Sequence, residues 1–271
     1  MICLVDMEHE QAVRRGAPCL EVATNGRSRH EAYCADLRRR LEETSGDTCL
    51  TRRYPDVTRE WLTAADVSAL VLSGNVTAWD TYDPADLQEL QTFVRSGSVP
   101  ILGLCGGLQF IAMAHGAEVG PIRKLQSAKE DAASDYAPGY LKEWGFTPVR
   151  VLRSDPIWEG LDNPVFLEAH YWEVKTVPQG FDILASTQTC RVQMLHRAGT
   201  LVYGTQFHPE AFIVKPVDRR NCLIERIYPA GYTRQQPDGY RLLSNFFREV
   251  SASGQEPSTR SLSSTIDCSD D

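Results

Sequence analysis

One cysteine lies in a setting that favours nucleophilic chemistry. Cys105 stands between glycines in residues 103–109, after an apolar stretch (99–104) and before a helical one (108–114). Small residues around a nucleophile let the chain turn sharply and lift the reactive side chain above the sheet edge. The start of a helix also directs unpaired N–H groups and a positive dipole end at the sulfur, which favours the thiolate. The pattern predicts a reactive cysteine at a strand-to-helix turn.

A buried cysteine is more often a small apolar packing residue than a nucleophile, so catalysis needs a base and a group that orients it. His208 and Glu210 meet this need, because they follow the apolar stretch 201–203, which is typical of a buried strand. Ligands bind at the carboxyl ends of strands in open α/β sheets. Side chains two apart in an extended chain face the same way, so Glu210 is expected to hold one ring nitrogen of His208 while the other faces Cys105.

Together, the sequences Gly-Leu-Cys-Gly-Gly-Leu-Gln and Gly-Thr-Gln-Phe-His-Pro-Glu resemble the motifs of the class I (triad) glutamine amidotransferase family, and are similar to those of the glutaminase domain of GMP synthase. The resemblance extends over nearly the whole chain, to about residue 250. It implies an α/β fold with an open, mostly parallel twisted sheet flanked by helices, flavodoxin-like, with some antiparallel edge strands. It also implies that Cys105, His208 and Glu210 are the catalytic triad.

The resemblance further implies where glutamine binds. In the family, a glycine loop after a strand supplies one half of the oxyanion hole, and the backbone after the nucleophile supplies the other. The positions implied to bind substrate are Gly74, Asn75, Gly106, Gln109, His170 and Tyr171. Two of them have another interpretation: Gln109 as an exposed helix residue, and His170 as a packed structural histidine, since a lone histidine beside aromatic residues is more often structural than an acid or base.

The implied reaction is hydrolysis of L-glutamine to glutamate and ammonia through a thioester on Cys105, without a metal or cofactor. The chain has no nucleotide-binding P-loop, so a separate synthetase is expected to accept the ammonia. A self-contained hydrolase of γ-glutamyl amines or peptides is the alternative, although Gly106 is smaller than the residue usual there in such relatives. A catalytically silent binding protein is the third hypothesis, and the complete triad argues against it.

Composition sets further limits. The 271-residue chain carries a net charge of −8, without a basic run, which argues against a nucleic-acid partner. Its apolar stretches are too short to span a membrane, and its start reads as a strand, so we expect a cytoplasmic protein. The 8 cysteines are scattered without Cys-x-x-Cys pairs, so neither a disulfide framework nor a zinc site is expected.

Apolar runs suited to buried parallel strands alternate with amphipathic helical stretches. Asp83 followed by Pro84 is a strong helix start signal, and Gly97 is expected to end that helix. After residue 119 the runs become short, which favours antiparallel hairpins. The expected strands are 2–6, 48–54, 67–72, 99–104, 146–152, 165–167, 173–177, 183–186, 191–196 and 201–207, and the other expected helices are 31–41 and 238–250.

These elements predict one domain over residues 1–250. Residues 251–271 are rich in serine and acidic residues, which predicts a disordered tail. Segments 123–140 and 212–237 have no clean helix or strand pattern. Long loops near a site are often functional, so 212–237 is a candidate lid or docking segment, with a solvated surface insertion as the alternative. Segment 123–140 is a second candidate for docking the synthetase.

Overall fold

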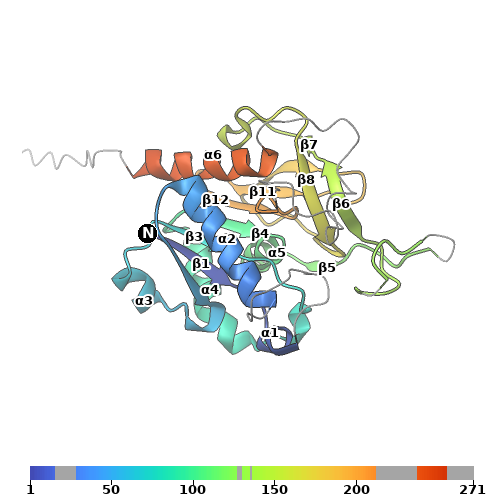
Figure 1. The fold of residues 1–271 in the computed structure, drawn as a ribbon, viewed down its shortest axis with the longest axis horizontal. Helices are drawn as coiled ribbons and strands as arrows, with labels where there is room; N and C mark the ends of the chain where they lie inside the picture. The colour runs from blue at the N-terminus through green and yellow to red at the C-terminus, as the bar shows by residue number, and fades with distance from the viewer. Residues whose placement is uncertain (16–28, 127–129, 135, 212–236, 255–271) are drawn as a thin grey trace, which may run out of the picture.

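The chain folds around one large twisted sheet with helices on both faces (Figure 1). The computed structural model describes residues 1–15, 29–126, 130–134, 136–211 and 237–254. Eight strands form this sheet in the order β2-β1-β3-β4-β12-β11-β10-β7, and two further pairs are β5-β9 and β6-β8. The first five strands of the order are mutually parallel, and the last three add antiparallel. The predicted fold class is confirmed.

The strands are β1 (Ile2–Asp6), β2 (Cys49–Arg53), β3 (Ala69–Leu72), β4 (Ile101–Leu104), β5 (Val119–Pro121), β6 (Glu143–Pro148), β7 (Arg150–Val151), β8 (Val165–His170), β9 (Trp172–Val174), β10 (Phe181–Ser186), β11 (Met194–Arg197) and β12 (Val202–Thr205). The helices are α1 (Glu10–Arg15), α2 (Arg29–Ser45), α3 (Arg59–Ala64), α4 (Pro84–Ser96), α5 (Gly106–Ala114) and α6 (Asp238–Ser253). Short 3-10 turns are η1 (Tyr54–Asp56), η2 (Trp79–Thr81) and η3 (Pro156–Trp158).

Alternating side chains of the central strands build two cores. In β1, Cys3 and Val5 join the core under α3, α4 and α5, while Ile2 and Leu4 join the core under α2 and α6. Such strands are buried on both faces, which is why they read as continuous apolar runs rather than alternating ones. Helices α2 and α6 pack side by side across one face (Figure 1). Because these strands are parallel, their carboxyl ends lie at one edge of the sheet. Helices cover both faces of the sheet beside this edge.

Helix α4 begins and ends where the sequence predicts. The side chain of Asp83 accepts a hydrogen bond from the backbone N–H of Ala85, and Pro84 occupies the first helical position, where its missing N–H costs nothing. Gly97 ends the helix in the left-handed conformation, at φ 60°, which favours glycine. The turn after Gly97 directs the chain into β4, the strand that leads to the predicted nucleophile.

Departures from the predicted elements occur in both halves: helices α1 and α3 have no predicted counterpart, and the later strands differ in their bounds. The sequence predicts one strand over 146–152, but this run divides at buried Val149 into β6 and β7, which join different sheets. Pro148 ends β6, since it has no N–H to continue the ladder. Strand β5 has no counterpart among the predicted strands, and α6 extends to Ser253. The predictions for segment 212–237 and the tail fall almost entirely outside the described residues.

Candidate active site

Cys105 occupies a strained turn between β4 and α5. Its backbone has φ 50° and ψ −101°, a conformation that residues other than glycine rarely adopt. Its N–H donates to the carbonyl of Thr205, at the end of β12, over 2.6 Å. Gly103 and Gly107 make the turn possible, because a Cβ on Gly103 would lie 2.5 Å from the carbonyl oxygen of Gly107. Strain of this kind persists only where surrounding structure imposes it, and it is concentrated at functional sites.

His208 and Glu210 follow β12 at the same edge of the sheet. Nδ1 of His208 lies 2.8 Å from Oε1 of Glu210, and the backbone N–H of His208 donates to the carbonyl of Leu167 over 2.9 Å. The expectation of an extended chain here is wrong: a turn follows His208, closed by the N–H of Ala211 on the His208 carbonyl at 3.1 Å. The carboxylate still reaches the ring because the turn folds Glu210 back beside it.

The structure brings His208 against Cys105. The two side chains are hydrogen-bonded, and a Cβ added at Gly74 would lie 3.4 Å from Cε1 of His208 and 3.5 Å from Cβ of Cys105. Burial disfavours a charge on His208, but the charges of Glu210 and Cys105 and hydrogen bonds to both raise its pKa well above the ordinary value. The geometry therefore suits an imidazolium held between a sulfur and a carboxylate.

The loop after β3 lies over the cysteine turn. Gly74 and Asn75 follow this strand, and the Asn75 side chain donates to the carbonyl of Thr77 over 2.7 Å and to the Tyr82 hydroxyl over 3.0 Å. A Cβ on Gly106 would lie 3.0 Å from the backbone nitrogen of Asn75 and would overlap its side-chain oxygen. Only glycine lets the two backbones approach this closely, which puts both predicted oxyanion donors on facing chains.

Glu8 fastens that loop to the end of β1. Its two carboxylate oxygens accept from the Val76 N–H over 2.7 Å and from the Thr77 hydroxyl over 2.6 Å. The residue is 5% exposed, so these bonds are shielded from water. Sequence reasoning missed Glu8, because a single acidic residue after a strand carries no motif.

Gln109 and Gln206 connect the pocket wall to the sulfur. Gln109 accepts from the Trp79 indole over 2.9 Å and donates to Oε1 of Gln206 over 3.2 Å, and Gln206 lies 3.4 Å from Sγ of Cys105. The resemblance implies that Gln109 binds the substrate; here it lines the pocket with its amide engaged by neighbouring side chains. Gln206 was missed as a contact of the sulfur, although it stands inside the motif that supplies His208.

His170 is held on three sides. Its Nδ1 lies 2.8 Å from the carbonyl of Trp172, and its Nε2 lies 3.1 Å from Glu143 and 3.2 Å from Glu168. Burial opposes its charge, yet hydrogen bonds to the two carboxylates raise the pKa of His170 to about 10. Burial raises the pKa of Glu168 to about 7. These contacts favour a structural cation at His170, while its position still borders the pocket.

A pocket that is partly open to solvent joins these groups. Aromatic side chains form much of its wall, including Tyr171, predicted from the sequence, and Tyr136, from the 123–140 segment. The pocket is lined by Asn75, Val76, Thr77, Ala78, Trp79, Cys105, Gln109, Tyr136, His170, Tyr171 and Trp172. Tyr136 packs edge-on against Tyr171 at 5.4 Å between ring centres, so the segment contributes at least this residue to the site.

Within the described residues, metal-ligand side chains meet at two places that the sequence does not indicate. One is the trio Asp6, His30 and Cys34, and the other is Glu143, His170 and Cys190. Both lie outside the Cys105, His208 and Glu210 group. Among the described residues, none of the helices has the length and apolar character of a membrane-spanning segment.

Most of the chain matches the model of a known protein family. The model of the family "Glutamine amidotransferase class-I" matches residues 32–219, so the chain belongs to this family of enzymes.

Individual relatives are consistent with this assignment. The chain is 34% identical over 145 residues to one subunit of the glutamine-hydrolyzing GMP synthase of Thermoplasma acidophilum, a match covering 53% of this chain and 64% of that protein, less than two thirds of its length. The corresponding GMP synthase subunit of Pyrococcus abyssi is 29% identical over 152 residues, covering 56% of this chain and 70% of that protein.

A solved structure from Thermoplasma acidophilum, assigned provisionally as this same GMP synthase subunit, has a TM-score of 0.60 at 24% identity and covers 94% of this chain and 96% of its own. A glutamine amidotransferase from Methylobacillus flagellatus has a TM-score of 0.54 at 16% identity, covering 93% and 92%. At these identities, the two structures show the shared fold.

Proposed function

We propose that this protein is a glutaminase that hydrolyses L-glutamine to glutamate and ammonia through a thioester on Cys105. One observation carries the proposal: the strained Cys105 turn and the His208–Glu210 pair meet at one edge of the sheet, beside the pocket that Cys105 lines. The family match supports the same chemistry. Residues 1–250 would act as one domain, without a metal or cofactor in the reaction.

In the proposed mechanism, the Cys105 thiolate attacks the side-chain amide carbon of glutamine. The oxygen gains negative charge, and the N–H groups of Gly106 and of the Gly74–Asn75 loop stabilise it. Such a donor is worth a few kcal/mol in the transition state. The imidazolium of His208 gives its proton to the departing ammonia, and the carbon–nitrogen bond breaks to leave the thioester.

The second half reverses these proton movements. Neutral His208 takes a proton from water, whose oxygen attacks the thioester carbon, and the carbon–sulfur bond breaks to release glutamate and restore the thiolate. Glu210 orients the ring and stabilises its charge in both halves. Three pocket residues, Gln109, His170 and Tyr171, would position the glutamine. Gln109 and His170 would do so through the neighbouring pocket groups and would not transfer a proton.

We further propose that the ammonia passes to a separate synthetase. Support comes from the relatives, which are named as subunits of a glutamine-hydrolyzing GMP synthase. A γ-glutamyl hydrolase is the second candidate, and the aromatic wall around Trp79 and Tyr171 favours it, because such a wall could bind the apolar substituent of a γ-glutamyl amine.

The test measures glutamate release by the purified chain from L-glutamine and from a γ-glutamyl alkylamide, beside its Cys105→Ala variant. Glutamine hydrolysis that disappears in Cys105→Ala supports the proposal. Preference for the alkylamide selects the second candidate. Cys49→Ala is the matched control, because Cys49 is a buried cysteine at the opposite end of the parallel strands and its removal should leave turnover unchanged. Turnover that survives in Cys105→Ala would contradict both candidates.

A further inference from the structure

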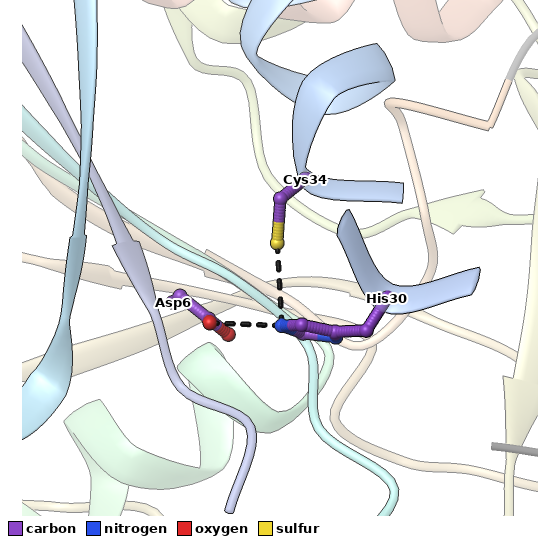
Figure 2. Close-up of side chains that lie close together, drawn as sticks. All are labelled: Asp6, His30 and Cys34. Atoms are coloured by element: carbon purple, nitrogen blue, oxygen red, sulfur yellow. Dashed lines mark hydrogen bonds and ion pairs between the residues drawn. The ribbon is translucent and has the colours of Figure 1, made fainter. Parts of the chain in front are cut away.

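Three side chains of metal-ligand type converge at the end of β1 (Figure 2). Asp6 ends β1, and His30 and Cys34 stand one helical turn apart on α2, so that both face the strand end (Figure 2). Nε2 of His30 lies 2.8 Å from Oδ2 of Asp6 and 3.4 Å from Sγ of Cys34. One carboxylate oxygen, one imidazole nitrogen and one sulfur therefore point at a common centre.

The separations are close to those of a tetrahedral zinc site. With Zn–N near 2.05 Å, Zn–O near 2.0 Å and Zn–S near 2.3 Å, tetrahedral geometry places N about 3.3 Å from O and about 3.6 Å from S. The His30–Cys34 distance already fits, and the His30–Asp6 distance must widen by about half an ångström. Small side-chain rotations provide this, because the two helix residues and the strand residue lie on separate elements.

Hydrogen bonds alone satisfy these three side chains poorly. Nε2 of His30 can carry only one hydrogen, yet it faces both Asp6 and Cys34. A divalent cation at the shared centre would serve all three atoms at once.

The neighbouring side chains allow a cation to replace the hydrogen bonds of the trio. Nη1 of Arg53 lies 3.3 Å from Oδ2 of Asp6, but its side chain is 30% exposed and also lies over the ring of Tyr54, so it can leave the carboxylate without losing its other contact. The second oxygen of Asp6 accepts from the Glu8 N–H over 3.1 Å and keeps the carboxylate aimed at α2.

We propose that Oδ2 of Asp6, Nε2 of His30 and Sγ of Cys34 bind a borderline-soft divalent transition-metal ion of the Zn²⁺ class, with water as the fourth ligand. Binding forms three metal–protein bonds. The Cys34 thiol releases its proton to solvent, and Nε2 of His30 loses its proton either to solvent or, as the neutral tautomer, to Nδ1. Thiolate and imidazole together select zinc-like ions over Mg²⁺ or Ca²⁺.

Such an ion would fix the start of α2 to the end of β1. Tyr33 lies between the two helix ligands in sequence and contacts Glu210, so the site acts as a clamp beside the candidate triad rather than as part of it. The trio of Glu143, His170 and Cys190 does not offer the same opportunity. Glu143 there already accepts from Thr187, Gln193 and His170.

The test uses Co²⁺, whose bond to a thiolate produces a charge-transfer absorption band, with the full chain in a Cys105→Ser background. That background removes any metal binding by the triad sulfur. We expect one Co²⁺ per chain with a thiolate band, displaced by Zn²⁺ and accompanied by a higher thermal midpoint. Adding Cys34→Ser or His30→Gln should remove the band and the thermal shift.

Cys190→Ser in the same background is the matched control, since it removes a buried cysteine of the other trio and should leave the band intact. A band that survives Cys34→Ser, or the absence of any band from a folded Cys105→Ser chain, would overturn the proposal. Binding does not depend on glutamine turnover, so its failure is distinct from failure of the glutaminase proposal.

Discussion

Tyr33 donates a hydrogen bond from its hydroxyl to Oε1 of Glu210 over 3.4 Å, the same oxygen that lies 2.8 Å from Nδ1 of His208. Burial and the charge of Glu210 raise the pKa of Tyr33 well above its ordinary value, so the hydroxyl stays protonated and available as a donor. A residue of α2, distant in sequence from both motifs, therefore helps to hold the carboxylate that orients the histidine.

Replacing Tyr33 with Phe should lower kcat for glutamine hydrolysis about fivefold with little change in KM. The lost hydrogen bond is worth about 1 kcal/mol and acts on Glu210 rather than on the substrate. Steady-state kinetics measure the split. Tyr203→Phe is the matched control, because the Tyr203 hydroxyl bonds Asp155 away from the site. An equal loss of kcat in both variants would show a general effect on folding.

Glu210→Gln should change the pH dependence of the reaction. Burial disfavours charged His208, and Glu210 is the largest influence that raises its pKa. Removing that negative charge lowers the pKa, so the alkaline limb of kcat/KM should move to lower pH by about 1 to 3 units, together with a lower maximum rate.

Asp155→Asn provides the comparison for Glu210→Gln, because Asp155 lies 3.3 Å from Nδ1 of His196 in a similar pair remote from Cys105. The profile should stay unchanged in this variant. An unmoved alkaline limb in Glu210→Gln would assign that limb to a group other than His208.

Gly106→Ala should disable the proposed oxyanion hole. The added methyl group would overlap the Asn75 side chain, which is held by Thr77 and Tyr82, so the loop must move away from Cys105. We expect kcat to fall about a hundredfold or more, measured beside the circular dichroism spectrum. In the control Gly120→Ala, the added methyl group would contact only Lys175, at 3.7 Å, and kcat should stay unchanged. Full activity in Gly106→Ala would remove this loop from the mechanism.

The stacked pair Phe166 and Phe207 should contribute strongly to stability. Their ring centres are 4.0 Å apart with an interplanar angle of 7°, and both side chains are buried. Phe166→Ala should lower the free energy of unfolding by about 3–5 kcal/mol, since it removes a large buried ring and leaves a cavity. Chemical denaturation measures the change, and the partly buried Phe93 supplies a control whose truncation should cost clearly less.

The sequence predicts the central strands and helix α4 well, because their signals are local. Continuous apolar runs give β1, β3 and β4, and the Asp83–Pro84 start with Gly97 at the end gives α4. The later strands are less well bounded. Strands β6 and β7 are nearly contiguous in sequence but pair with different partners, and only tertiary pairing decides where one ends.

The candidate site likewise divides into residues that local motifs predict and residues that only the tertiary structure brings together. Cys105, His208 and Glu210 stand in compact motifs, so their proximity follows once the strands are parallel neighbours. The supporting residues Glu8, Tyr33 and Gln206, and the trio at Asp6, join side chains far apart in sequence. No spacing rule connects such residues. Their roles emerge only from the register of β1 and the position of α2.

The hydrogen bond from the Cys105 N–H to the carbonyl of Thr205 has a consequence for the order of assembly. Strand β12 is added between β4 and β11, about a hundred residues after the nucleophile is synthesised. A nascent chain that stops before Thr205 lacks the acceptor that holds the cysteine backbone in its strained form, and also lacks His208. The proposed site is therefore incomplete until β12 is in place, because this strand supplies the acceptor for the Cys105 N–H and leads into His208.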